Sequence, residues 1–340
     1  MTTLNPAGPW KAMTALRLFT ATALLLCTAP APAAPPGSPW GANYFPDISL
    51  VNQDGKTLRF YDDMVKDKVV MINFMYSTCH DACPLETAKL RQVQEALGDR
   101  VGRDVFMYSI SITPEHDTPA VLKEYAAKFK VGPGWQFLTG KEADITLLRK
   151  KLGLYDEGEQ RSDHSMNMIV GNEATGQWKH RSTFDNPKVL ARVVGDDLFN
   201  FSTPTSGEKS YADASKVIAL DPGEDLFRRR CQVCHTVGAG DTMGPDLIGV
   251  VAKRDRKWLV HWIQAPNELL EAKDPTATAL YAQYNKVTMP NLRLSDHDVE
   301  VLIGYLEAES QRVASMREGG GHDVHHHHMH QVTADMTTHP

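Results

Sequence analysis

The chain of 340 residues is longer than one hydrophobic core usually serves, so we expect two domains with flanking tails. Its composition, 42% hydrophobic and 23% charged, is that of a globular protein. The formal net charge of −6, with acids and bases interspersed, offers no basic surface to nucleic acid and no polybasic patch to an acidic membrane. Charge therefore excludes nucleic acid as a partner and identifies no other.

Residues 1–34 have the pattern of an export signal. Lys11 and Arg17 precede the apolar run 18–29, and the sequence Ala-Pro-Ala-Ala follows it. The run fits the ~7–15 residues of a signal's apolar region and is shorter than the ~20 residues of a membrane-spanning helix. We expect export to the periplasm or to the outer face of the inner membrane, with an uncleaved N-terminal membrane tether as the alternative.

Residues 37–200 alternate short apolar runs with helical patterns, which predicts an α/β domain. The run 69–76 is almost continuously apolar, as in a strand covered on both faces. It leads to Cys79 and Cys83, after which apolar residues recur at helical spacing. The cysteines are therefore expected in the turn and at the helix start beyond the carboxyl end of a central strand, where helix amides favour a thiolate.

The other elements expected in this domain give a thioredoxin-like order. A second buried strand at 105–112 leads to a helix that Thr118 caps and that runs to Phe129. The remaining predictions are a strand at 135–138, a helix at 141–152, a strand at 163–170 with a hairpin partner at 177–181, and a helix from 187 to about 199.

The rest of the chain divides into three segments by composition. Residues 201–219 are a polar linker without periodicity, and residues 220–310 have helical patterns. Residues 311–340 form a low-complexity tail that holds seven of the fourteen histidines, and we expect it to be disordered. Such a tail suggests capture of copper or nickel, with a flexible, weakly binding tail as the alternative.

The sequence Cys231-Gln-Val-Cys234-His235 is the attachment motif of a c-type haem. The two sulfurs would fix the porphyrin edge, and His235 would supply one axial nitrogen. A soft, neutral donor suits the second axial position, and Met289 stands 54 residues beyond the histidine in a loop before a helix. The alternative axial donors are Met243 and His261.

Residues 221–309 resemble class I cytochrome c domains. The resemblance rests on the haem motif, on Gly244-Pro245-Asp246-Leu247 and on the sequence that runs from Met289 to Asp296. It implies an all-α domain with one covalent haem c. It also implies that Pro245 supports the haem-binding histidine.

Three roles remain open to Cys79 and Cys83: a structural disulfide, a thiol–disulfide exchange site and a copper site. Their spacing of four places both sulfurs on one helical face, a turn apart. Two thiolates with one imidazole suit both copper oxidation states, and His164 is the candidate imidazole, with Asp163 placed to orient it. Residues 155–170 lack the proline that a thioredoxin-type reductase places opposite its cysteines.

Residues 45–199 resemble the Sco/SenC family of copper chaperones. The matching motifs are Asn73-Phe74 before Thr78-Cys79-x-x-x-Cys83-Pro84, Pro114-Glu115-x-Asp117-Thr118-Pro119, Leu138-Thr139-Gly140 and Asp163-His164-Ser165. The resemblance implies a thioredoxin-like fold and copper bound by Cys79, Cys83 and His164. Two positions depart from the family. His80 replaces a usual proline, as a solvated side chain or an extra copper donor, and Thr113 replaces a usual aspartate.

The two resemblances together predict the function. The family implies delivery of copper to the dinuclear centre of cytochrome c oxidase, so the expected partner is the oxidase subunit that carries this centre. A tethered haem suggests electron transfer to or from the copper or the Cys79–Cys83 pair, and other redox proteins as further partners. The alternatives are a haem-linked thiol–disulfide oxidoreductase of the cell envelope and a plain electron carrier.

Overall fold

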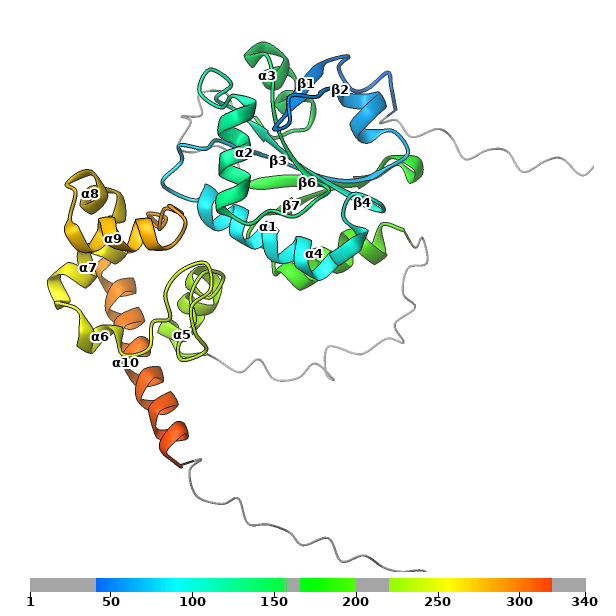
Figure 1. Cartoon of the computed structure of the whole chain (residues 1–340). Helices are drawn as coiled ribbons and strands as arrows, with labels where there is room; N and C mark the ends of the chain where they lie inside the picture. Colours follow the sequence, from blue (N-terminus) through cyan, green and yellow to red (C-terminus); the bar gives the residue numbers. More distant parts are fainter. Residues whose placement is uncertain (1–40, 156, 158–165, 200–219, 320–340) are drawn as a thin grey trace, which may run out of the picture. The chain divides into compact units, whose positions relative to one another are not determined.

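A computed structural model describes residues 41–155, 157, 166–199 and 220–319 (Figure 1). The expected export signal, the linker 201–219 and the histidines of the tail lie outside these ranges. Among the helices described, none combines the length and the apolar character that crossing a membrane requires.

One mixed sheet of seven strands, in the order β2-β1-β5-β4-β3-β6-β7, forms the centre of residues 41–199. The strands are β1 (Ser49–Asn52), β2 (Thr57–Arg59), β3 (Val69–Met75), β4 (Val105–Ser111), β5 (Trp135–Thr139), β6 (Asn167–Asn172) and β7 (Gln177–Ser182). β3, β4 and β5 are parallel, and the other neighbours are antiparallel. The hairpin β1–β2 was not predicted, because strands of four and three residues are too short to give an apolar run or a clear alternation.

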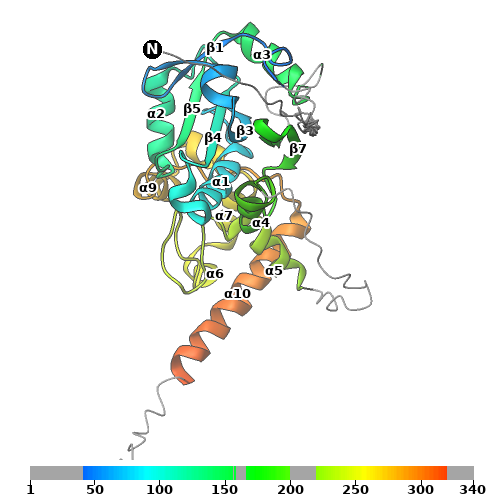
Figure 2. The ribbon, with the colours of Figure 1, turned by 90° about the vertical axis from the view of Figure 1, so that its right-hand side faces the viewer.

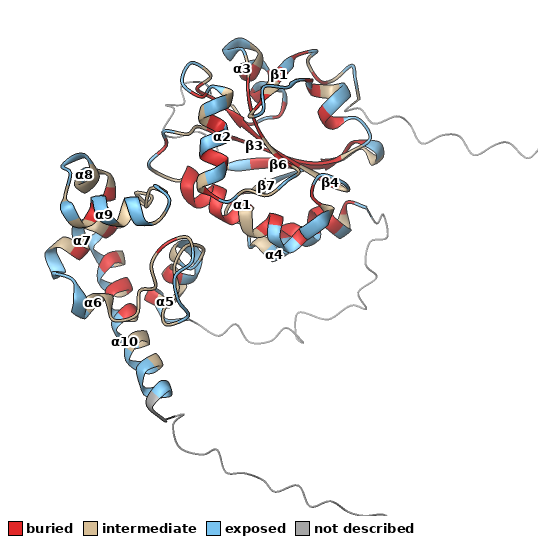
Figure 3. Ribbon diagram, viewed as in Figure 1, coloured by how far each residue is buried: buried red, intermediate tan, exposed pale blue. Residues whose placement is uncertain are grey.

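Helices cover both faces of this sheet (Figures 1 and 3). They are α1 (Cys83–Leu97), α2 (Pro119–Lys128), α3 (Glu142–Lys151) and α4 (Pro187–Arg192). Side chains of α1, α2 and α4 share one buried cluster with Met71 and Met75, whereas α3 and the helical turn Phe60–Val65 pack with Ile72 and Phe74 on the other face. β3 is thus buried on both faces, as its continuous apolar run predicts, and the α/β fold class is confirmed.

Residues 220–319 are helical, which confirms the predicted all-α class. The helices are α5 (Pro222–Leu226), continued by the turn Phe227–Cys231, then α6 (Val250–Lys253), α7 (Arg256–Gln264), α8 (Pro266–Glu271), α9 (Pro275–Gln283) and α10 (Asp296–Gly319). Their small core is Phe227, Leu259, Ile263, Val299, Leu302, Ile303 and Leu306. α5 lies beside α10 in both views (Figures 1 and 2).

The start of α10 agrees with the sequence, and its end does not. Ser295 caps the helix as expected, since its Oγ accepts the Asp298 amide at 3.2 Å. The helix then continues to Gly319, so the domain end expected at residue 310 falls inside a helix. Residues 311–319 were predicted to belong to the disordered tail from their low-complexity composition. Their charged residues and alanine are, however, good helix formers.

Candidate functional site

Cys79 and Cys83 lie just beyond the carboxyl end of β3. Cys79 is in the turn that follows Met75, and Cys83 is the first residue of α1. Neither cysteine forms a disulfide, and both are buried, with exposed fractions of 5% and 0%, whereas His80 between them is exposed. The prediction that both cysteines share a helical face is therefore wrong, because α1 begins only at Cys83. The turn before α1 brings their sulfurs within hydrogen-bond contact instead.

The two thiols differ in how readily they ionise. A hydrogen bond from Cys83 is the main reason that the pKa of Cys79 falls to about 6, against the opposing effect of burial. The backbone amides of Cys83 and Asp81 lower it further, as expected at a helix start. Burial and the shared hydrogen bond raise the pKa of Cys83 well above its usual range. The pair thus holds one proton at neutral pH, and Cys79 is the available thiolate.

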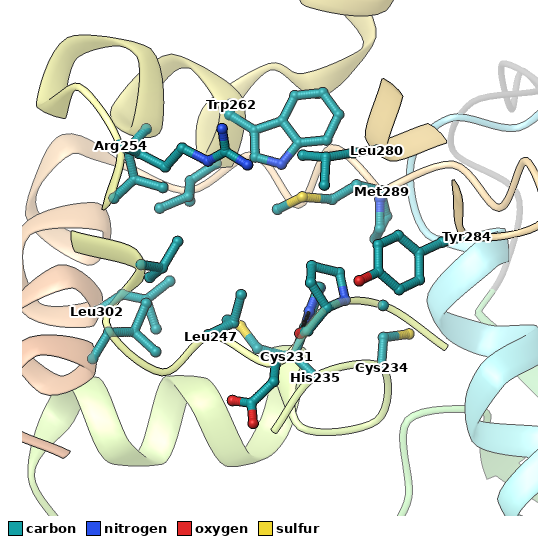
Figure 4. A pocket seen from close by; sticks show the side chains of 18 of the residues that line it. Cys231, Cys234, His235, Leu247, Arg254, Trp262, Leu280, Tyr284, Met289 and Leu302 are labelled. Carbon is teal, nitrogen blue, oxygen red and sulfur yellow. Dashed lines mark hydrogen bonds between the residues drawn. The ribbon is translucent and has the colours of Figure 1, made fainter. Parts of the chain in front are cut away.

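A second constellation lines an apolar cavity within residues 220–319 (Figure 4). Cys231, Cys234 and His235 lie on one side of it, and Met289 points into it from the opposite side. The apolar lining includes Phe227, Leu247, Leu259, Trp262, Leu280 and Leu302. Burial raises the pKa of both thiols to about 12, so both keep their protons. Apolar walls with two thiols, an imidazole and a thioether fit a c-type haem.

The chain around His235 fixes the orientation of its ring. Nδ1 donates a hydrogen bond to the carbonyl oxygen of Pro245 at 2.9 Å, which leaves Nε2 as the atom free to bind iron. Burial lowers the pKa of the imidazole, although the Pro245 bond opposes this, so the ring is neutral. A Cβ atom at Gly244 would lie 2.5 Å from Cε1 of the ring, so only glycine allows this approach.

Residues 39–195 match the family described as SCO1/SenC, and residues 220–309 match the family described as cytochrome c. The chain is an SCO1/SenC domain followed by a cytochrome c domain. Both resemblances predicted from the sequence are confirmed. The match to the cytochrome c family covers the cavity-lining cysteines, histidine and methionine together.

Known relatives resemble the SCO1/SenC part. An SCO2-like protein of Rickettsia felis is 29% identical over 156 residues, which are 44% of this chain and 74% of that protein. The SCO1 homologue of Bacillus subtilis is 36% identical over 94 residues, 27% of this chain and 47% of the relative. ScoI of Bradyrhizobium japonicum, solved with copper bound, is 27% identical and aligns over 43% of this chain and 94% of its own, with a TM-score of 0.37.

Two residues near the SCO1/SenC cysteines were missed by the sequence reasoning. Tyr76 donates a hydrogen bond to Cys79, and burial, together with the charge of that thiolate, raises the phenol pKa above its usual range. Glu86 is completely buried in the first turn of α1, three residues after Cys83. The helical spacing of Glu86 from Cys83 was the signal that the sequence offered.

The environment of Glu86 keeps its carboxyl group protonated. Asn73 Nδ2 donates to Oε1 at 3.0 Å, Ser109 Oγ donates to Asn73 Oδ1 at 2.7 Å, and Trp135 Nε1 donates to Ser109 Oγ at 2.9 Å. Burial raises the pKa of Glu86 to about 8, although hydrogen bonds with Asn73 and Thr183 oppose this. The helix start therefore holds a neutral acid close to Cys83.

Asp117 fixes the turn that carries Cys79. Its buried carboxylate accepts the Ser77 amide at 3.0 Å, the Ser77 hydroxyl, and the Ser111 hydroxyl at 2.6 Å. Thr113 Oγ1 donates at 3.1 Å and His116 Nδ1 at 3.0 Å. Burial disfavours the charge, yet these donors outweigh it and lower the pKa of Asp117. Thr113, where the Sco family usually has aspartate, thus supplies a donor to a carboxylate instead of a second negative charge.

His164, the third predicted copper ligand, and its neighbour Asp163 lie outside the described residues. Met166 leads into β6 at the edge of the sheet where β3 ends, since the strands are antiparallel with Ile72 opposite Ile169. Within the described ranges, no group of three or more His, Cys, Asp and Glu side chains is arranged to hold a metal. The copper ligand set therefore stays a prediction.

The alternative axial donors of the cytochrome c domain lie away from the position opposite His235. Met243 Sδ is 3.8 Å from Cys234 Sγ, on the side of the cavity that carries the histidine. His261 is exposed, pairs with Glu268 at 3.0 Å, and does not line the cavity. Of the three candidates, Met289 alone faces His235 across the cavity (Figure 4).

Proposed function

We propose that this protein is an exported copper chaperone for assembly of the dinuclear copper centre of cytochrome c oxidase. The observation that carries the proposal is the buried pair of Cys79 and Cys83, not joined in a disulfide, beyond β3 of an SCO1/SenC domain. Copper is bound in the similar ScoI structure. The proposed site is the periplasm or the outer face of the inner membrane, and the proposed partner is the oxidase subunit that receives copper.

Copper is the cargo, and its proposed ligands are Cys79, Cys83 and His164. Thiolates select Cu(I), and an imidazole nitrogen helps to hold Cu(II). Cys79 offers a thiolate at neutral pH, whereas Cys83 must lose its proton when the metal binds. Copper binding is therefore expected to release about one proton from the pair.

The cytochrome c domain is proposed to carry one covalent haem c. Cys231 and Cys234 would bind its edge, His235 and Met289 would bind its iron, and the carbonyl of Pro245 holds the histidine ring. When bound, the haem supplies one-electron transfer. One electron matches the Cu(II)/Cu(I) couple, whereas reduction of a disulfide takes two electrons. A single haem can therefore complete electron exchange with bound copper in one step, whereas it would have to react twice to reduce a disulfide.

A haem-linked thiol–disulfide oxidoreductase is the second candidate. It is favoured by the lowered pKa of Cys79 beside a protonated Cys83, the arrangement in which a thiolate attacks a disulfide. This reaction needs no metal and does not depend on His164. Loss of the His164 imidazole should therefore impair the copper chaperone and leave the oxidoreductase active.

The test is anaerobic Cu(I) titration of the full haem-loaded chain against a chelator strong enough to strip copper from imidazoles alone. The chaperone is expected to retain one copper that the Cys79→Ser and Cys83→Ser variants lose, and His164→Ala should weaken it. His180→Ala, at an exposed position on β7, is the matched control. If no copper is retained against the chelator while dithiol exchange is rapid, the oxidoreductase is the function.

Electron transfer is tested by rapid mixing. The reduced, haem-loaded chain is mixed with Cu(II), and haem oxidation is followed optically. We expect oxidation in the intact chain to be faster than in an equimolar mixture of Cys79→Ser and His235→Ala chains, in which the copper site and the haem reside on different molecules. Equal rates would rule out transfer within one chain.

A further inference from the structure

The last turns of α10 contact the loop that follows the haem motif. The cytochrome c family match ends at residue 309, whereas α10 continues to Gly319 (Figure 2). Two polar contacts and one apolar contact join residues 310–317 to the loop 236–249. The segment 310–317 is called the strap below.

Each contact of the strap is specific. Ser310 Oγ accepts the amide of Gly249 at 3.0 Å, and Arg317 Nη2 donates to the carbonyl oxygen of Gly238 at 2.5 Å. Val313 lies between them, half-buried against Gly238. A Cβ atom at Gly238 would lie 2.5 Å from Val313 Cγ1, and the φ of this glycine is +89°, so the close approach needs glycine.

The loop held by the strap is ordered around one carboxylate. Asp246 accepts the amides of Gly238 at 2.7 Å, Gly240 at 2.8 Å and Ile248 at 2.9 Å. Burial opposes the charge, but these amides, with the charge of Arg317, lower the pKa of Asp246. Arg317 therefore acts on both partners of the bond between the Gly238 amide and Asp246. It binds the carbonyl oxygen of Gly238, and its charge stabilises the Asp246 carboxylate.

Asp246 is the direct neighbour of the group that orients the haem-binding histidine. Pro245 gives the carbonyl that holds His235 Nδ1, and Gly244 packs against the ring. The amide of Gly244 donates to the carbonyl of Cys234 at 2.8 Å, so the loop also returns onto the haem motif. A displacement of the loop would move the carbonyl of Pro245, and with it the ring of His235.

We propose that the strap fixes the loop 236–249 and so sets the orientation of His235 toward the haem iron, with Ser310, Val313 and Arg317 as positioning residues. The inference rests on the haem attachment proposed above. It adds to that function a determinant of the haem environment that lies beyond the end of the cytochrome c match.

The test compares Arg317→Gln with Arg312→Gln in the full haem-loaded chain. Arg312 lies on the same helix but pairs with Glu309, with no bond to the loop among the residues described, so it is the matched control. Arg317→Gln should speed hydrogen exchange of the Gly238 and Gly240 amides by about three- to tenfold, the value of one hydrogen bond. It should also shift the His235 ring resonances and the haem midpoint potential. The control should change none of these.

A second variant keeps the test decisive. Val313→Ala removes the apolar contact without touching a charge, and it should move the same loop amides and the same histidine resonances in the same direction. If both variants loosen only the end of α10 and leave the His235 resonances and the potential unchanged, the strap is merely structural and the inference is wrong. Absence of covalent haem from the parent chain would instead contradict the proposed function, and the exchange of the loop amides would still report on the strap.

Discussion

Glu86 lies three residues beyond Cys83 in the first turn of α1, and both side chains are completely buried. A carboxyl group at a helix N-terminus is normally stabilised as the anion. Here burial outweighs that effect and raises the pKa of Glu86 to about 8. The Glu86 carboxyl group and the Cys83 thiol are therefore both protonated, because burial disfavours the carboxylate and the thiolate alike.

This arrangement predicts how stability depends on pH. The folded-state pKa of Glu86 is raised, so its contribution is complete below the unfolded value near 4.5 and is lost as pH rises toward about 8. Over that window the unfolding free energy of the first domain should fall by about 1.4 kcal/mol per pH unit from this group. Glu86→Gln should flatten the slope in urea unfolding at several pH values. Glu95→Gln, at an exposed site on the same helix, should keep it, and equal slopes in both variants would contradict the assignment.

The phenol of Tyr76 is predicted to keep Cys79 ionised. Tyr76→Phe removes one hydrogen bond to the thiolate, so the pKa of Cys79 should rise from about 6. The pH at which alkylation of Cys79 reaches half its maximal rate measures this, in a Cys83→Ala background to report one thiol. The background itself should raise the midpoint, because Cys83 supplies the largest stabilising hydrogen bond.

The control for that measurement is Tyr61→Phe, which removes a phenol that bonds Glu173 at 2.9 Å, away from the cysteines. Its alkylation midpoint should equal that of the background. A midpoint that rises equally in both tyrosine variants would show that Tyr76 acts through general destabilisation and not through the thiolate.

Loss of the Asp117 charge should loosen the turn before Cys79. Asp117→Asn leaves at least one of the donors from Ser77, Ser111, Thr113 and His116 unpaired. We expect a loss of about 2–3 kcal/mol in unfolding free energy and a weaker hold on Cu(I) in competition with a chelator. Asp54→Asn, which breaks an exposed pair with Lys123, should change neither quantity measurably. An Asp117→Asn protein with unchanged copper affinity would show that the turn is fixed by other contacts.

The fold was largely predictable because the strongest signals were local. The continuous apolar run of β3 predicted a strand buried on both faces, and Thr118 marked the start of α2, where its Oγ accepts the Val121 amide at 3.4 Å. β1 and β2 were missed because their pairing, Leu50 opposite Leu58, depends on contacts between strands and leaves little trace in the sequence.

The residues of the candidate sites also differ in whether a local sequence motif or only a tertiary contact identifies them. The spacing of Cys231, Cys234 and His235 is a local motif, and the structure brings these residues to one cavity. Glu86 was overlooked because glutamate in a helix is usually exposed, and only tertiary burial makes it a neutral acid. The strap contact of Arg317 with Gly238 joins positions 79 residues apart, and no pattern in either segment predicts it.

Met289 is predicted to set the haem potential. A thioether stabilises ferrous haem, so Met289→Ala should lower the midpoint potential by on the order of 0.2 V in spectroelectrochemical titration and open the iron to added imidazole. Met243→Ala removes a thioether that lies 3.8 Å from Cys234 on the other side of the cavity, and it should preserve both the potential and the closed iron. If the Met243 variant opens the iron and the Met289 variant does not, the loop before α10 is not the axial element, and the ligand lies beside the haem motif itself.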